Sequence, residues 1–174
     1  MQEIYGINLS TSATSIITNK VSQAATEWQN RPLDNLYMIV WMDDIVFKVR
    51  ENGKVINKTV YLCVGLNKEG LKEVLGMWIG KNESAAFWLG VLTDLKARSV
   101  EDILTTVTDK LNGFTETIKS VFPASITQIC VVHQIRNSCR HVVWKEKKEF
   151  TADLSNIYNA PIKEAVEMER SEER

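Results

Sequence analysis

The sequence predicts an α/β fold with one mixed sheet, and three observations support this class. First, three runs rich in β-branched and aromatic residues follow one another at 37–49, 55–66 and 72–79, which predicts an antiparallel meander. Second, helical and strand patterns alternate after residue 84, as is typical of parallel crossovers in a mixed sheet. Third, 174 residues with 44% hydrophobic content suffice for one core and leave little room for two full domains.

Composition indicates the environment of the chain. The net charge of -1 gives no overall attraction to nucleic acid, although it leaves room for a local basic patch. Three cysteines, an odd number, fit a reducing cytosol better than a disulfide-bonded secreted protein. The longest apolar runs are far shorter than the ~20 residues that span a bilayer. We therefore expect a cytoplasmic protein with no membrane partner.

The N-terminal residues 3–21 contain a turn at Gly6, then cap-forming residues, then apolar residues at helical spacing. Turn followed by helix is the outline of the second half of a helix-turn-helix. Only Lys20 is basic, so two interpretations stay open, a DNA-reading helix and an ordinary packing helix. The polar stretch 26–35 includes an Arg-Pro step and predicts a linker.

The first strand carries two acids, Asp43 and Asp44, inside an apolar run from Tyr37 to Arg50. An unpaired ionised carboxylate in a buried strand costs several kcal/mol, so at least one acid needs a partner, and a cation is the obvious one. Successive side chains on a strand point to opposite faces, so only one acid can serve a site. We assign that role to Asp43 and treat Asp44 as structural, with a register shift of one residue as the alternative.

Turn and cap residues define the other elements. Glu51-Asn52-Gly53-Lys54 predicts a hairpin turn, and residues 67–70 predict a looser one. The further elements expected are a helix capped by Asn82 or Ser84 and running to residue 95, a strand 103–109, a helix 114–121, a strand 127–132, a helix from His133 to about Phe150, and a charged helical segment 152–174.

A metal site follows if the strand that ends in Asp109 lies beside the strand of Asp43. Two carboxylates held close together repel each other unless a divalent cation lies between them. Few carboxylates and open positions for phosphate oxygens suit Mg²⁺, and two such ions can activate a nucleophile and stabilise the leaving oxygen of a phosphodiester. A complete site usually needs a third or fourth acid. The alternative for Asp109 is a turn residue after a strand.

Cys130, His133, Cys139 and His141 fall within twelve positions and suggest zinc. On one helix His133 and His141 share a face while Cys139 points away, so the four cannot converge. A buried Cys130 and a His133 at the start of the helix, beside the carboxylates, fit better. His133 then orients a ligand or contacts phosphate, or it is a half-buried histidine with satisfied hydrogen bonds.

The densest basic cluster surrounds Trp144. Its members are Arg136, Arg140, Lys145, Lys147 and Lys148. Such cations can contact phosphates without reading sequence. The alternative is a solvated helix face.

Four strings resemble the bacterial Mutator-like insertion-sequence transposases. They are EWQNRPLD at 27–34, KEVLGMWIGKNESAAFW at 72–88, LTDLKAR at 92–98 and CVVHQIRNS at 130–138. They occur in the family's order, and the resemblance extends over roughly residues 3 to 161.

The resemblance implies a ribonuclease H-like catalytic domain with an Asp-Asp-Glu triad and Mg²⁺ (or Mn²⁺), which cuts and rejoins DNA at element ends. Asp43 matches the first acid and Asp109 the second, and Cys130 and His133 match the Cys-x-x-His motif that follows. Residues 3–21 match a helical region that contacts terminal DNA repeats. The implied partners are terminal inverted repeats, target DNA and further copies of the chain, and the implied location is the nucleoid.

Several features depart from the family pattern. In the family the third acid, a Glu, lies beyond a helical insertion. We expect residue 174 to fall near the start of that insertion, so that this chain lacks the Glu and is inactive alone. The alternatives are a non-catalytic DNA-binding or regulatory remnant and a decayed reading frame. Asp44 replaces the usual small residue, and Lys110 replaces the usual Gly and could compete with a metal at Asp109.

The expected organisation has three parts. Residues 1–33 form a helix-turn-helix-like remnant and linker, residues 34–150 a partial ribonuclease H-like core, and residues 151–174 the start of the insertion.

Overall fold

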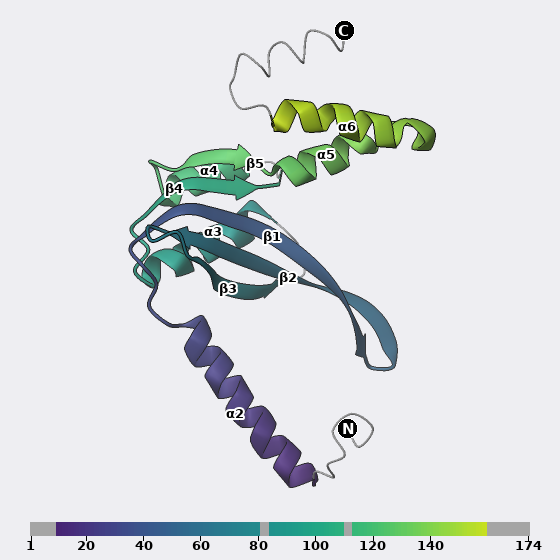
Figure 1. Ribbon diagram of the computed structural model, residues 1–174. Coiled ribbons are helices and arrows are strands. Elements are labelled where there is room, and N and C mark those ends of the chain that lie inside the picture. The colour runs from purple at the N-terminus through teal and green to yellow at the C-terminus, as the bar shows by residue number, and fades with distance from the viewer. Residues whose placement is uncertain (1–9, 81–83, 110–112, 160–174) are drawn as a thin grey trace.

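A five-stranded mixed sheet forms the centre of the computed structural model, which describes residues 10–80, 84–109 and 113–159 (Figure 1). Its order is β3-β2-β1-β4-β5. The strands are β1 Leu36–Glu51, β2 Lys54–Asn67, β3 Lys72–Gly80, β4 Asp102–Thr108 and β5 Ile126–Ile129. β1, β2 and β3 pair antiparallel, whereas β4 is parallel to β1 and β5 is parallel to β4. This topology confirms the predicted meander and the mixed sheet.

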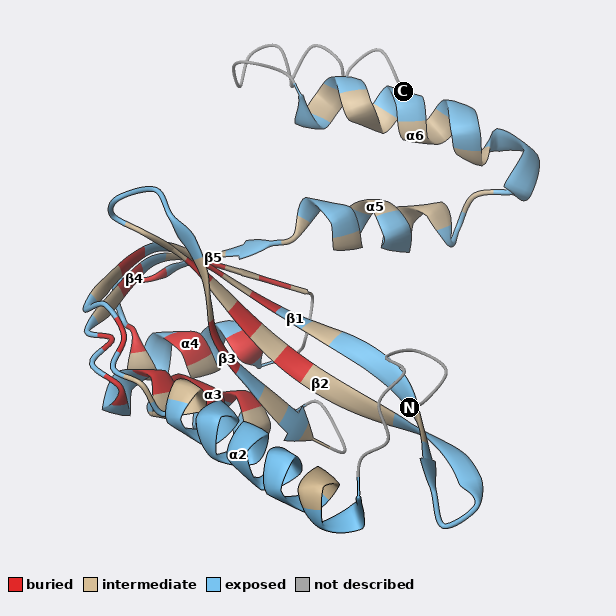
Figure 2. Cartoon of the chain, turned by 60° about the horizontal axis from the view of Figure 1, so that its bottom comes forward, coloured by how far each residue is buried: buried red, intermediate tan, exposed pale blue. Residues whose placement is uncertain are grey.

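Two helices cover one face of the sheet. The helices of the described residues are α2 Thr11–Gln29, α3 Ala85–Ala97, α4 Phe114–Val121, α5 Val131–Cys139 and α6 Lys147–Tyr158, with a 3-10 turn at Trp144–Glu146. α3 and α4 pack on the sheet, as the buried residues in Figure 2 show, whereas no residue of α2, α5 or α6 is buried. The core therefore lies between the sheet and α3 and α4.

Aromatic rings fill that core. The Trp88 ring is fully buried and stacks on Phe114 with centroids 4.9 Å apart, while Tyr61 meets its edge at 5.5 Å. The ring centroid of Phe87 lies 4.3 Å from that of Tyr61. Ser84 caps α3 by accepting a hydrogen bond from the Phe87 N–H, as the sequence predicts. Asn82, the other predicted cap, lies outside the described residues.

The opposite face of the sheet stays largely open. Met77 and Ile79 of β3 and Ile45 and Phe47 of β1 are exposed there, Ile79 to 74%. The sequence-based expectation of a buried first strand is therefore wrong for its second half, because α3 and α4 cover only the first half and only one side.

The N-terminal helix is longer than the sequence suggests. α2 continues through residues 26–29, which we predicted as part of a linker, and the linker begins only at Asn30. Its last turn is held because Gln29 Oε1 accepts a hydrogen bond from the Met77 N–H at 3.0 Å. The predicted turn at Gly6 lies outside the described residues.

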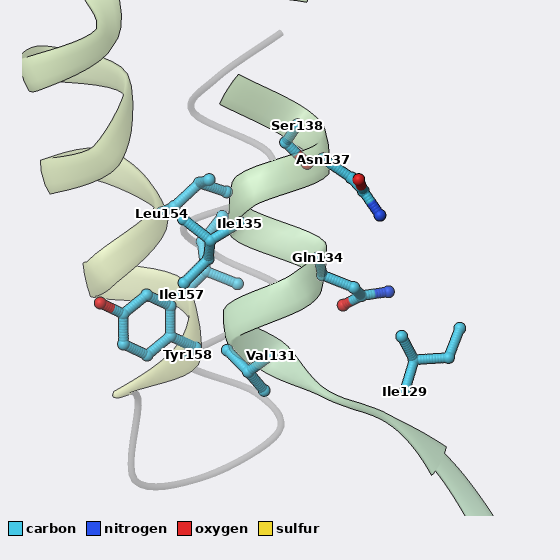
Figure 3. Close-up of a pocket in the computed structure, with 9 residues that line it drawn as sticks. All are labelled: Ile129, Val131, Gln134, Ile135, Asn137, Ser138, Leu154, Ile157 and Tyr158. Carbon is cyan, nitrogen blue, oxygen red and sulfur yellow. The ribbon is translucent and has the colours of Figure 1, made fainter. Parts of the chain in front are cut away.

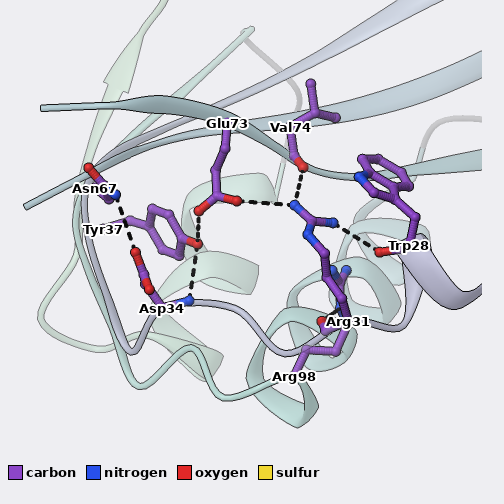
Figure 4. Close-up of polar contacts among 8 residues, drawn as sticks. All are labelled: Trp28, Arg31, Asp34, Tyr37, Asn67, Glu73, Val74 and Arg98. Atoms are coloured by element: carbon purple, nitrogen blue, oxygen red, sulfur yellow. Dashed lines mark hydrogen bonds and ion pairs between the residues drawn. The ribbon is translucent and has the colours of Figure 1, made fainter. Parts of the chain in front are cut away.

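A polar network fastens this linker to the sheet (Figure 4). The fully buried Tyr37 donates from its hydroxyl to Glu73 Oε1 at 2.6 Å, and Arg31 Nη2 donates to Glu73 Oε2 at 3.1 Å and to the Val74 carbonyl at 2.7 Å. Arg98 Nε donates to the Arg31 carbonyl at 3.0 Å. Burial raises the pKa of Tyr37 above its ordinary value, with Glu73 adding to the effect.

The C-terminal elements correct two predictions. β5 ends at Ile129, and Val131 and Val132, predicted as strand, form the first turn of α5. The single helix predicted from His133 to Phe150 is wrong, since α5 ends at Cys139 and α6 begins at Lys147. Adjacent β-branched residues at 142 and 143 disfavour helix there. The boundary proposed at residue 150 falls within α6.

Candidate functional site

One predicted acid, Asp43, lies on β1, and the other, Asp109, directly follows the parallel neighbour β4. β1 pairs with β4 from Leu36 opposite Asp102 to Trp41 opposite Val107. Asp43 and Asp109 each follow the last pair by two residues, so they lie at the same level of the sheet. The site is thus at the carboxyl end of β4 and the middle of β1.

Side-chain alternation separates Asp43 from Asp44. Asp43 follows Trp41 on the open face, while Asp44 follows the buried Val40 and Met42 on the helix-covered side. The Asp43 side chain is 54% exposed. Our expectation that the first acid is buried and desolvated is therefore wrong, because the open face of the sheet leaves it in water.

His133 lies beside Asp43. Its Nε2 is 3.7 Å from Asp43 Oδ1, and its side chain is about three-quarters buried. The Cys130 N–H donates to the Thr108 carbonyl at 2.7 Å, and this bond fixes the start of α5 against the end of β4. His133 Nδ1 is buried and has no hydrogen-bond partner among the described residues.

The pKa of Asp109 is raised in the folded protein. Partial burial raises the pKa of its carboxyl; His133 opposes this effect, and the negative charges of Asp44 and Asp43 add to it. Asp44 is thus part of the electrostatic field at Asp109 even though it points to the other face. Sequence reasoning missed this because strand alternation predicts direction but not the reach of a charge over several ångströms.

The donor set suits a hard divalent cation. Carboxylate oxygens are the ligands that Mg²⁺ prefers, and an acid whose pKa is raised partly by neighbouring carboxylates, as that of Asp109 is, gains from a cation between them. In residues 10–80, 84–109 and 113–159, no group of three or more His, Cys, Asp or Glu side chains converges closely enough to hold a metal ion. The described residues therefore form no complete metal-binding group by themselves. Lys110, the predicted competitor at Asp109, lies outside them.

The other cysteine and histidine of the zinc-like pattern lie elsewhere. Half-buried Cys139 Sγ contacts Thr151 Oγ1 of α6 at 3.7 Å, and exposed His141 follows the end of α5. Cys130 is half-buried, not fully buried as expected, and precedes α5 as its cap residue. None of the three joins His133 at the carboxylates in the structure described.

The predicted DNA-contacting cations are exposed on separate elements. Lys20 lies on α2, Arg136 on α5, Arg140 directly after α5, and Lys145 in the 3-10 turn. Arg136, Arg140 and Lys145 thus do not share the single helix that the sequence predicted for them.

A groove with apolar and uncharged polar lining lies between α5 and α6 (Figure 3). Its volume is about 380 Å³, and Ile135, Leu154, Ile157 and Tyr158 line it from the two helices. It contains no charged side chain and is distinct from the carboxylate site.

In the part of the chain that the structure describes, no helix is long and apolar enough to cross a bilayer.

Sequence comparison places these features in a family. The family model described as "Transposase, Mutator family" matches residues 1–173. A probable transposase for an ISRM3-like insertion sequence element of Sinorhizobium fredii is 44% identical over 165 residues, covering 95% of this chain and 41% of the relative. The IS256 transposase of Staphylococcus aureus is 29% identical over 91% of this chain and 41% of its own length. The chain thus spans about two fifths of the length of these relatives.

Solved structures give weaker likenesses. The HTLV-2 integrase catalytic core domain in complex with magnesium covers 80% of this chain and 85% of its own, at 16% identity and a TM-score of 0.39. The Mos1 transposase catalytic domain, with Raltegravir and Mg, covers 94% and 90% at 14% identity and a TM-score of 0.32. The sequence match, which extends over nearly every residue, decides the assignment: this chain belongs to the Mutator family of transposases.

Proposed function

We propose that this chain supplies two acids of the metal-dependent phosphoryl-transfer site with which an insertion-sequence transposase cleaves DNA and transfers strands at element ends. The observation that carries the proposal is the position of Asp43 and Asp109 at one level of two adjacent parallel strands, with His133 beside Asp43. Relatives named as insertion-sequence transposases support the reaction class.

Asp43 and Asp109 hold Mg²⁺ or Mn²⁺ in this proposal. The bound ion supplies Lewis acidity and charge neutralisation at a phosphodiester. His133 keeps the Asp43 carboxylate in position through their 3.7 Å contact. Because the Asp43 side chain is half exposed, a DNA phosphate can reach it from the open face of the sheet.

The test is metal binding. Isothermal calorimetry with Mg²⁺ or Mn²⁺ should show weak binding to the 174-residue chain and none to Asp43→Asn. Asp153→Asn is the matched control, since it removes an exposed carboxylate from α6, away from the site, and it should bind like the parent chain. Binding unchanged in Asp43→Asn would rule the site out.

A second candidate is a non-catalytic, DNA-binding or regulatory form of such a transposase. It is favoured by the observation that the described residues hold no three-acid group. Full-length relatives have more than twice the length that this chain covers, so a third acid can come from elsewhere in such a protein. A gel-shift assay with terminal-repeat DNA, run with and without Mg²⁺, separates the two: binding without cleavage supports the regulatory form.

A further inference from the structure

Strands β1 and β2 continue as a free two-stranded ribbon, residues 47–58, after their neighbours have ended. The pairing of β2 with β3 ends at Thr59 opposite Gly80, and that of β1 with β4 ends at Trp41 opposite Val107. Figure 1 shows the ribbon projecting well past the rest of the sheet. An isolated two-stranded hairpin is only marginally stable in water, and no third described strand pairs with residues 47–58 of this one.

The register divides the ribbon into two different faces. The mixed face consists of Phe47 opposite Lys58, Val49 opposite Ile56, and Glu51 opposite Lys54 at the tip. The basic face consists of Lys48 opposite Asn57 and Arg50 opposite Val55. Lys48, Arg50 and Asn57 are all exposed. The basic face therefore presents two cations and an amide, and no acid.

The charge of the ribbon differs from that of the chain. Residues 47–58 hold four cations and one acid, a net charge of +3 in a chain whose net charge is -1. The acid, Glu51, is paired with Lys58 at 3.1 Å. Lys48 and Arg50 form no ion pair with any residue that the structure describes. These two cations are available for an external anion.

We propose that the basic face of the ribbon binds the phosphate backbone of duplex DNA, with Lys48 and Arg50 each neutralising a phosphate and Asn57 donating a hydrogen bond. A ribbon of two strands ~4.8 Å apart fits the ~12 Å major groove, which admits such ribbons. That the polyanion is DNA rests on the proposed function. The assignment of the contact to the basic face of the ribbon rests only on the charge and shape of that face.

The position of the ribbon fixes where this contact falls. Lys48 is five residues beyond Asp43 on the same strand, roughly 16 Å at ~3.3 Å per residue. Side chains alternate along β1, so Lys48 and Arg50 lie on the side of Asp44 and not on the open face of Asp43. The ribbon therefore contacts a DNA segment other than the one that a metal at Asp43 would hold.

The experiment measures the salt dependence of DNA binding by the full chain. Fluorescence anisotropy with a duplex of about thirty base pairs, between ~50 and ~200 mM salt, gives the slope of log K against log salt. In Lys48→Ala/Arg50→Ala the slope should become less steep by about 2, one per lost phosphate contact. Lys54→Ala/Lys58→Ala removes the same charge from the other face and should keep the parent slope.

Two outcomes overturn the ribbon contact: equal slopes in the two double variants, or no measurable binding of duplex by the parent chain. Thermal unfolding of both variants, with midpoints equal to each other, shows that neither is merely unfolded. The metal titration of Asp43→Asn is independent of this slope. If the two double variants have equal slopes but Asp43→Asn loses metal binding, the ribbon contact is wrong and the proposed metal site is supported. If the slopes differ as expected but Asp43→Asn binds metal like the parent chain, the metal site is wrong and the ribbon contact is supported.

Discussion

The imidazole of His133 lies against the carboxylate of Asp43, with Nε2 3.7 Å from Oδ1, although ninety residues separate them in the sequence. α5 brings them together, because the Cys130 N–H is bonded to the end of β4 and the third residue of the helix then reaches β1. The contact gives the Cys-x-x-His spacing a physical meaning: the first residue ties the start of the helix to the end of β4, and the second faces the acid.

Removing His133 should weaken metal binding without removing a carboxylate. Partners that orient a ligand typically contribute a factor of roughly 10 to 100 in metal affinity. We expect His133→Ala to raise the calorimetric dissociation constant for Mn²⁺ at least tenfold. His141→Ala, which removes the exposed histidine after α5, should leave it unchanged. Equal constants in the two variants would contradict a positioning role.

Neutralising Asp109 should stabilise the metal-free chain. Its pKa is raised in the folded state, so the folded protein binds a proton more tightly than the unfolded chain does. The contribution of protonated Asp109 to the free energy of unfolding is fully present below the ordinary Asp pKa of ~3.9. It is lost as the pH rises through the raised pKa that Asp109 has in the folded state. Asp109→Asn should therefore raise the unfolding midpoint near pH 7 by on the order of 2 °C.

Scanning calorimetry in a chelating buffer, repeated at acid pH, checks this prediction. The difference between the variant and the parent chain should shrink as the pH falls, because both side chains are then neutral. A midpoint for Asp109→Asn below that of the parent chain at pH 7 would show that the carboxylate is stabilised by the fold.

Core packing at Trp88 should dominate the stability of the chain. This ring is fully buried between α3, α4 and the sheet, so Trp88→Ala should cost about 3 to 5 kcal/mol in the free energy of unfolding. Trp144, which is 83% exposed, is the matched control, and Trp144→Ala should stay within about 0.5 kcal/mol. Urea titrations measure both. Similar losses would mean that the aromatic core is not where the structure places it.

The two glycines at positions 53 and 90 should respond to alanine with opposite signs. Gly53 has φ +76° in the turn of the ribbon, where a side chain is strained, so Gly53→Ala should destabilise by about 1 kcal/mol. Gly90 lies within α3 with nothing within 4 Å of an added methyl, so Gly90→Ala should stabilise by about 0.5 to 1 kcal/mol. Chemical denaturation gives both values, and equal signs would contradict the turn geometry.

Local patterns in the sequence predicted most of the fold. The Asn52-Gly53 pair specified the hairpin, since both residues have positive φ, and Ser84 specified the start of α3. These features depend on a few neighbouring residues, so a sequence shows them directly. The adjacency of β1 and β4 is not local: the sequence offered it only as a condition of the site, and the strand pairing confirms it.

Long-range contacts account for what the sequence did not show. α2 keeps its last turn because Gln29 bonds to β3, forty-eight residues away. The exposure of Asp43 depends on which face of the sheet the helices cover, and apolar neighbours in sequence could not reveal it. The effect of the Asp44 charge on the pKa of Asp109 likewise depends on how close the two carboxylates lie in the folded chain, which the sequence does not show.

The Gln29 and Arg31 side chains have one more effect, on the free edge of β3. They engage the Met77 N–H and the Val74 carbonyl, two of the main-chain groups that an incoming strand would need there. A further strand is therefore disfavoured at the β3 edge of the sheet. The β5 edge can accept one, since its outer side faces no other described strand. Any extra strand, from the same polypeptide or another, would enlarge the molecule beside the acids and away from the linker.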